Sequence, residues 1–144
     1  MASRRDKIKA WNEASIKRNG KNFVTMRFDV LKSPQFTGLS GNAVKLLMYF
    51  CSQYNGFNNG DMSAPKNRAA DVGMSPMTLE KAKQELLDKG FIIVTRQGGR
   101  NLCSLYALTF FAIDECGGKL DVPPTRRAPD YWEQVDRDLI GSPP

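Results

Sequence analysis

The stretch that decides the fold covers residues 67–91 and reads NRAADVGMSPMTLEKAKQELLDKGF. Ser75-Pro76 is a helix start signal, because a serine side chain caps free backbone N–H groups and proline is tolerated in the first helical turn. Gly90 is a stop signal after the last helix-forming residues. The apolar side chains between these signals recur at helical spacing: Leu79, Ala82, Leu86 and Leu87. The pattern predicts a helix over residues 76–89.

A shorter helix is expected just before it, opened by Pro65 and turning Ala69, Ala70 and Val72 inward. Gly73-Met74-Ser75 then makes the turn between the two helices, since a sharp helix-to-helix turn often needs a residue with positive φ. Lys83 falls near the apolar face of the second helix. We expect its stem to lie along the core edge while its ammonium reaches solvent.

A β-hairpin is predicted after the second helix. Residues 91–95 are β-branched and aromatic and indicate a strand. Gly98-Gly99 is a turn signal, and residues 102–111 are expected to form the returning strand. Arg96 and Arg100 flank this turn. Two arginines at a hairpin tip beside a basic helix suit contact with phosphates or with a minor groove.

The run from Asn67 to Thr78 resembles the helix-turn-helix of bacterial winged-helix regulators, and residues 86–92 resemble the end of their recognition helix. Residues 30–43 are similar to the lead-in of small winged-helix proteins encoded by phages and plasmids. The resemblance covers residues 23–113. It implies an α+β winged helix-turn-helix with a three-helix core, a small antiparallel sheet with its wing, and N- and C-terminal extensions.

The lead-in is expected to contain a strand over residues 23–28, a helical turn at 29–33 and a loop from Ser33-Pro34 to Gly38. Ser40 is expected to cap a helix over residues 41–54. The apolar face of that helix is predicted to hold Ala43, Val44, Leu47, Met48, Phe50, Cys51 and Tyr54. Residues 61–64 resemble the short strand that pairs with the wing hairpin.

We divide the chain into a basic N-terminal arm (1–22), a winged helix-turn-helix domain (23–116) and a Pro/Gly-rich linker with a short helix or tail (117–144). The arm has two readings: a short amphipathic helix with Ile8 and Trp11 on one face that contacts DNA or a second copy, or a solvated tail. Tyr131 and Trp132 in the polar tail suggest docking, either on the parent domain or on a protein partner.

Composition limits the classes of function. The chain has 144 residues and a formal net charge of +6, which favours a polyanionic partner, nucleic acid ahead of membrane. The sequence contains no histidine, which removes histidine-based acid–base catalysis and metal ligation. Its three cysteines lack paired spacing. We expect no cofactor, no metal, no catalytic site and no membrane span, and a cytoplasmic, nucleoid-associated location in a bacterial cell.

The expected partner is double-stranded DNA, with the 76–89 helix in the major groove and the 95–101 wing on the backbone or minor groove. On the 76–89 helix, Lys81 could contact guanine or a phosphate, Thr78 a phosphate or a thymine methyl, and Met77 a thymine methyl. Glu80 could accept from cytosine or repel a wrong register. The full set of candidate DNA-binding residues is Lys66, Arg68, Ser75, Met77, Thr78, Glu80, Lys81, Gln84, Arg96, Arg100 and Asn101.

Three functions remain open at this point. A transcriptional regulator of a phage or mobile element is favoured, because the chain is compact and has no effector domain. A replication-origin binding protein uses the same groove chemistry. A winged-helix adaptor that contacts protein through Tyr131 and Trp132 belongs to a different class. A small metal-dependent nuclease is disfavoured, because the carboxylates are not clustered. A homodimer on a pseudo-palindrome would extend the short reading surface.

Overall fold

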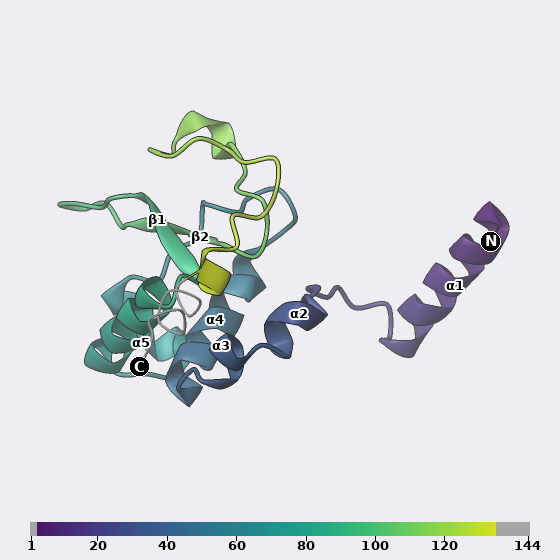
Figure 1. The fold of residues 1–144 in the computed structure, drawn as a ribbon, viewed down its shortest axis with the longest axis horizontal. Coiled ribbons are helices and arrows are strands. Elements are labelled where there is room, and N and C mark those ends of the chain that lie inside the picture. Colours follow the sequence, from purple (N-terminus) through teal and green to yellow (C-terminus); the bar gives the residue numbers. More distant parts are fainter. Residues whose placement is uncertain (1–2, 135–144) are drawn as a thin grey trace, which may run out of the picture.

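The computed structural model describes residues 3–134 of the chain. Its elements are, in order, α1 (Arg4–Lys17), α2 (Phe28–Leu31), α3 (Pro34–Thr37), α4 (Gly41–Gln53), the 3-10 helix η1 (Lys66–Val72), α5 (Pro76–Asp88), β1 (Ile92–Arg96), β2 (Leu105–Leu108) and the 3-10 turn η2 (Cys116–Gly118). The described part is therefore an α+β structure with several helices and one two-stranded antiparallel sheet, an arrangement compatible with a winged helix (Figure 1).

The core lies between α4, α5 and the sheet. Ser40 caps α4 as expected, since its hydroxyl accepts a hydrogen bond from the backbone N–H of Ala43. The face of α4 that is buried holds Ala43, Leu46, Leu47, Phe50 and Cys51. Leu46 was not predicted, and Met48 is exposed rather than buried. Cys51 is confirmed as a core residue, and its burial raises the pKa of its thiol to about 11.

The sheet is a hairpin with one irregular position. Ile92 pairs with Leu108 and Val94 with Tyr106, and the register then shifts before Arg96 pairs with Leu105. Thr95 sits in this bulge, and its buried hydroxyl donates to the carbonyl of Gly60. Met62 forms an isolated antiparallel bridge with Tyr106, which confirms the expected pairing of the 61–64 segment with the hairpin.

The residues after β2, 109–134, which we call the returning segment, run back over the domain. Asn59 is fully buried, and its side-chain amide donates to the carbonyls of Phe111 and Ala112 in this segment and exchanges hydrogen bonds with the backbone of Leu108 in β2. At its far end Trp132 is 3% exposed and stacks on Phe91 with ring centroids 5.9 Å apart. Trp132 therefore docks on its own domain, which was one of the two expected alternatives, the other being a protein partner. Residues 131–134 are helical, and the predicted continuation to Leu139 lies outside the described residues.

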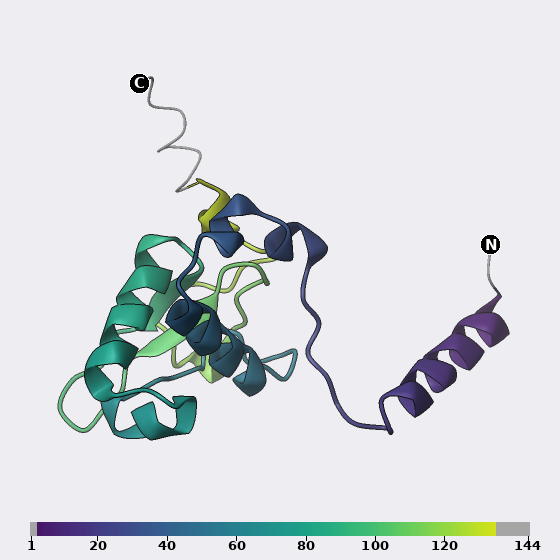
Figure 2. The ribbon, with the colours of Figure 1, turned by 90° about the horizontal axis from the view of Figure 1, so that it is seen from below.

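α1 does not lie against the domain as the returning segment does. Both ribbon views show it standing apart from the other elements at the end of an extended segment (Figures 1 and 2). Ser3 and Asp6 form a reciprocal capping box at its start, and no residue from Arg4 to Lys17 is buried. The predicted arm is thus a regular helix that buries none of its residues against the described part of the domain.

Further expectations for local structure were wrong. Residues 23–28 form no strand: residues 21–27 are irregular, α2 begins at Phe28, and the sheet within residues 3–134 pairs β1 with β2 alone. The expected helical turn at 29–33 is present as α2. The loop after Ser33 is instead α3, capped by the Ser33 hydroxyl with Pro34 in its first turn. The returning strand is shorter than 102–111, since Thr109 turns to bind Phe91 and Gly90. Ala70 is exposed, whereas Ala69 and Val72 are buried.

Candidate nucleic-acid interface

The helix–turn–helix junction is built as the sequence predicted. Gly73 has φ of +71°, the left-handed region that favours glycine. The N–H groups of Gly73 and Met74 donate to the carbonyls of Ala70 and Ala69 at 3.0 and 3.1 Å, which closes η1 before α5 begins. Ser75 then caps α5, because its hydroxyl accepts from the backbone N–H of Thr78 at 3.2 Å. The two helices are therefore joined with little freedom at the start of α5.

The inner face of α5 fixes it to the domain. Leu79, Ala82 and Leu86 are buried, as predicted. Glu85 adds a polar anchor that the sequence did not reveal: its carboxylate accepts from the backbone N–H and the hydroxyl of Ser40 at 2.8 and 2.7 Å. This contact ties α5 to the N-terminus of α4, where a carboxylate is favourable. The orientation of α5 is thus set from two sides.

Lys83 does not behave as expected. Its side chain is buried, and its ammonium lies 3.0 Å from a carboxylate oxygen of Glu80 and 5.7 Å from the ring centroid of Tyr106. The ammonium is turned to Glu80 instead of reaching solvent, because a buried cation is stabilised by a paired carboxylate and an aromatic face. Burial, followed by the nearby Glu80 carboxylate, raises the pKa of Tyr106. Glu80 is consequently engaged within the domain.

The outer face of α5 carries a stripe of exposed side chains. Met77, Lys81 and Gln84 follow one another at helical spacing, and Met77 is 71% exposed. With Lys66 and Glu80 they line a shallow hollow of about 570 Å³ between the start of η1 and α5. Five of the eleven candidate residues are therefore brought together on one surface. Gln84 also donates to Asp88 at 2.8 Å, one turn further along.

Ser75 and Thr78 lie at the N-terminal end of this stripe and are coupled to each other. The Ser75 hydroxyl donates to the Thr78 hydroxyl oxygen at 2.9 Å while it caps the helix. The Thr78 hydroxyl accepts that bond and keeps its own hydrogen for another acceptor. Ser75 therefore acts as the structural cap of α5, whereas the Thr78 hydroxyl can still donate a hydrogen bond to a ligand.

The hairpin residues fall into two groups. The tip consists of Arg100 and Asn101, because Gly99 and Leu102 pair through two backbone hydrogen bonds on either side of them. The turn therefore lies two residues beyond the predicted Gly98-Gly99. Gly98 has another role: a methyl group there would lie 2.5 Å from the carbonyl oxygen of Leu102. Arg100 and Asn101 are exposed, and Asn101 has φ of +59°.

Arg96 is the last residue of β1 and lies between the paired strands and the hairpin tip. Its guanidinium donates to the carbonyl of Cys103 at 3.1 Å, so it ties the end of β1 to the segment that leads into β2. Its Nε is buried and meets no acceptor within residues 3–134. Arg68 lies on η1 and faces Asp71 at 3.4 Å, with both side chains exposed. A weak surface pair of this kind leaves Arg68 available to another anion.

One cation near the junction was missed by the sequence reasoning. Lys45 projects from α4 toward the turn, since a methyl group on Gly73 would lie 2.6 Å from its ammonium nitrogen. No local pattern marks this residue, because its position depends on how α4 packs against the turn. Lys45, Lys66 and Lys81 are all exposed.

Within residues 3–134, no three His, Cys, Asp or Glu side chains form a group that could hold a metal ion. None of the helices in that range has the length and apolar composition needed to cross a bilayer. Comparisons with models of known protein families, with curated proteins and with solved structures returned no match. The function proposed below therefore stands on the geometry and chemistry of this chain.

Proposed function

We propose that the protein is a winged helix-turn-helix that binds double-stranded DNA sequence-specifically, with α5 in the major groove. The observation that carries the proposal is the outer face of α5. This face is exposed and carries Met77, Lys81 and Gln84, and the helix–turn–helix junction fixes the start of α5. An α-helix fits the width of a major groove, and because α5 is attached to the domain by its inner face, its outer face is free to enter one.

Each side chain on this face has a suitable role. Met77 offers an apolar group to a thymine methyl, which explains a methionine that is mostly exposed at the start of a helix. Lys81 fits a guanine edge or a phosphate, and Gln84 can pair with adenine by giving up its bond to Asp88. The free hydrogen of the Thr78 hydroxyl fits a phosphate oxygen. Ser75 and Glu80 act by holding α5 and its neighbours in place.

The hairpin would serve as the wing. Arg100 and Asn101 form its exposed tip, where a cation and an amide can meet the backbone or minor groove beside α5. Arg96 stiffens the hairpin through the Cys103 carbonyl and is not a direct contact. Lys66, Arg68 and Lys45 would approach phosphates from the other side of α5.

A small transcriptional regulator of a phage or mobile element is the role we favour, acting in the cytoplasm on the nucleoid. Binding to a replication origin would use the same surface. Because one α5 covers few base pairs, a homodimer on a pseudo-palindromic site is part of the proposal. The adaptor alternative relied on Tyr131 and Trp132. Trp132 is buried against Phe91, whereas Tyr131 is 42% exposed, so this alternative would have to rest on Tyr131.

The test is equilibrium selection of the purified chain on a randomised duplex pool at about 50 and 200 mM salt. Enrichment of a motif at both salt concentrations is the expected result, and a palindromic motif would indicate a dimer. Binding that weakens with salt but enriches no sequence would reduce the proposal to non-specific binding. The absence of duplex binding at either salt concentration would overturn it.

A residue-level test uses the enriched duplex with Lys81→Ala. Loss of one phosphate or base contact is expected to weaken binding by about tenfold, and a lost phosphate contact reduces the salt slope by about 0.9. Lys119→Ala is the matched control, because Lys119 is an exposed lysine next to η2 whose ammonium pairs with Asp61. Unchanged affinity and slope in Lys81→Ala would remove that residue from the interface.

A further inference from the structure

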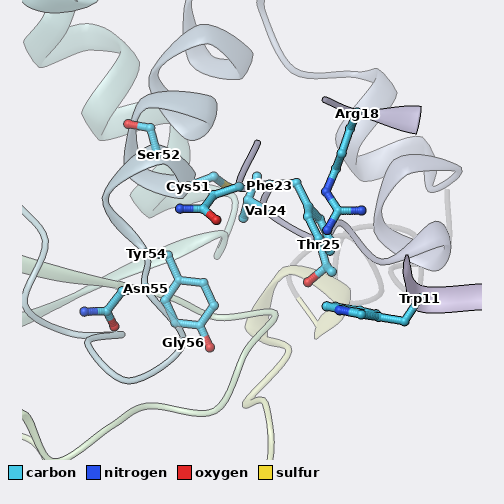
Figure 3. Close-up of a pocket in the computed structure, with 11 residues that line it drawn as sticks. Trp11, Arg18, Phe23, Val24, Thr25, Cys51, Ser52, Tyr54, Asn55 and Gly56 are labelled. Atoms are coloured by element: carbon cyan, nitrogen blue, oxygen red, sulfur yellow. The ribbon is translucent and has the colours of Figure 1, made fainter. Parts of the chain in front are cut away.

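A second surface, away from α5, has the features of a binding site. A groove of about 720 Å³ lies between the end of α1 and the end of α4. Trp11, Arg18 and Phe23 form its outer wall, and Tyr54 and Asn55 lie across from them (Figure 3). The Tyr54 ring is itself supported from behind, because it stacks on Phe111 at 4.9 Å. The groove therefore has a wall from the arm and a wall from the domain.

Two aromatic rings in this groove are exposed and yet held in place. Trp11 is 61% and Phe23 54% exposed, with their ring centroids 6.2 Å apart. The Arg18 guanidinium lies over both rings, at 4.3 Å from Phe23 and 5.6 Å from Trp11, and its Nε donates to the Lys21 carbonyl at 2.9 Å. This arrangement leaves flat aromatic faces open to solvent beside a fixed cation. Such surfaces suit a ligand that has its own flat rings.

The positive charge of the arm beside the groove indicates that the ligand is anionic. Residues 1–22 contain seven Lys and Arg against two Asp and Glu, a net +5, whereas the whole chain carries +6. Nearly all of the net positive charge therefore belongs to the arm and not to the domain that carries α5. α1 buries none of its residues, and an isolated helix of this length is only marginally stable in water. An anionic partner along the arm would supply the missing stabilisation.

We propose that this groove and the arm bind single-stranded nucleic acid. Unpaired bases stack on Trp11 and Phe23, and the phosphates lie along the Lys and Arg side chains of α1. Flat rings beside a positively charged track are how proteins hold single strands without reading their sequence. A duplex is a poorer match, because its base faces are covered by neighbouring base pairs and cannot reach Trp11 or Phe23. The site is separate from α5 and does not require that α5 bind duplex DNA.

The experiment measures fluorescence anisotropy of a labelled dT12 strand, and of a dA·dT duplex of the same length, titrated with the full chain. The wild-type chain should bind the strand more tightly than the duplex. Trp11→Leu and Phe23→Leu should each weaken strand binding by about tenfold, and Trp11→Phe should restore most of it. Arg18→Gln should weaken it as well. Trp11 and Phe23 are exposed, so circular dichroism should show these variants folded.

Phe28→Leu is the matched control, because Phe28 is also an exposed aromatic residue with a lysine, Lys32, over its ring, but it lies outside the groove. It should leave strand binding unchanged. Equal or tighter binding of the duplex, no binding of dT12, or equal losses in Phe28→Leu and Trp11→Leu would each overturn the proposal. Lys81→Ala should not affect dT12 binding. Strand binding without any selected duplex motif would contradict only the function proposed for α5.

Discussion

The two ends of the described chain look alike in sequence and behave differently in structure. Each is polar and each carries a tryptophan, Trp11 in α1 and Trp132 in the returning segment. Trp11 is mostly exposed and Trp132 is buried. The difference shows that an aromatic residue in a polar extension is not enough to dock it. Partners for its polar neighbours and its backbone are needed as well.

The returning segment has those partners. Asp130 accepts from the Arg27 guanidinium at 2.8 Å and from the Trp132 indole N–H at 3.1 Å. Backbone N–H groups of Asp121, Thr125 and Asp130 donate to carbonyls of the domain and of the segment itself. Within residues 3–134, the hydrogen bonds of α1 are those of the helix and of its Ser3–Asp6 cap, and the arm has an excess of like charge.

The largest expected effect separates the two tryptophans. Trp132→Ala should reduce the free energy of unfolding by about 3–5 kcal/mol, because it leaves a cavity against Phe91. Trp11→Ala should change it by less than about 0.5 kcal/mol, as for other surface substitutions. Chemical denaturation followed by circular dichroism measures both. Similar losses in the two variants would show that α1 packs on the domain in solution.

A second comparison uses two glycines, both with positive φ. Gly90 has φ of +79°, and a methyl group there would lie 2.8 Å from the carbonyl of Tyr131. Gly20, at φ of +67°, has nothing within 4 Å of that position. Gly20→Ala should cost at most about 1–2 kcal/mol of local strain, whereas Gly90→Ala adds a backbone clash and should cost more. Equal losses of stability on denaturation would mean that the returning segment does not rest on Gly90.

The ion pair between Arg27 and Asp130 gives a smaller effect. Asp130→Asn removes the charge but suits the positive φ of +53° at this position. We expect a loss of about 1 kcal/mol, since the Arg27 side chain is partly exposed and also binds Asp29 and the Phe110 carbonyl. The same denaturation assay applies. Stability equal to that of the wild type would assign the docking of this segment to Trp132 alone.

The smallest effect is a dependence on pH. The hydrogen bond from Arg27 lowers the pKa of Asp29, mainly against the opposing effect of desolvation. A lowered pKa in the folded state adds stability that is present above the unfolded value, near about 3.9, and is lost as the pH falls through the folded value. The difference between wild type and Asp29→Asn should be below about 1 kcal/mol at pH 6 and shrink toward pH 3. A difference that does not change with pH would contradict the pairing.

Local signals in the sequence predicted the helix–turn–helix junction well. They predicted the hairpin only in part, since its turn lies two residues further on and its returning strand is shorter than expected. Ser40, Ser75 and Gly73 act through their own backbone and nearest neighbours, and each performs the role that its residue type suggests. The misses depend on distant contacts. Residues 23–28 alternate like a strand, but the sheet within residues 3–134 consists of β1 and β2 alone. The stem of Lys83 was expected at the core edge with its ammonium in solvent, whereas the ammonium lies between Glu80 and the Tyr106 ring, which is distant in sequence.

The candidate site shows the same division. Met77, Lys81 and Gln84 could be grouped from helical spacing alone, because they share one face of one helix. Lys45 and Glu85 could not, since their places depend on how α4 packs against the turn and against α5. Arg96 was expected at the wing tip. Instead it pairs with Leu105 after the bulge that follows Val94, and its guanidinium donates to the Cys103 carbonyl.

The central claim is that the outer face of α5 reads duplex DNA, and the most direct measurement compares the motifs selected by two proteins. Wild type and Met77→Ala are carried through the same randomised duplex selection and sequenced. Met77 is exposed and lies outside the core, so the variant should fold. We expect both proteins to enrich one motif. In Met77→Ala the preference should be relaxed at a single thymine position, by about 1 kcal/mol for the lost apolar contact. Identical motifs from the two proteins, or no motif from wild type, would contradict the claim.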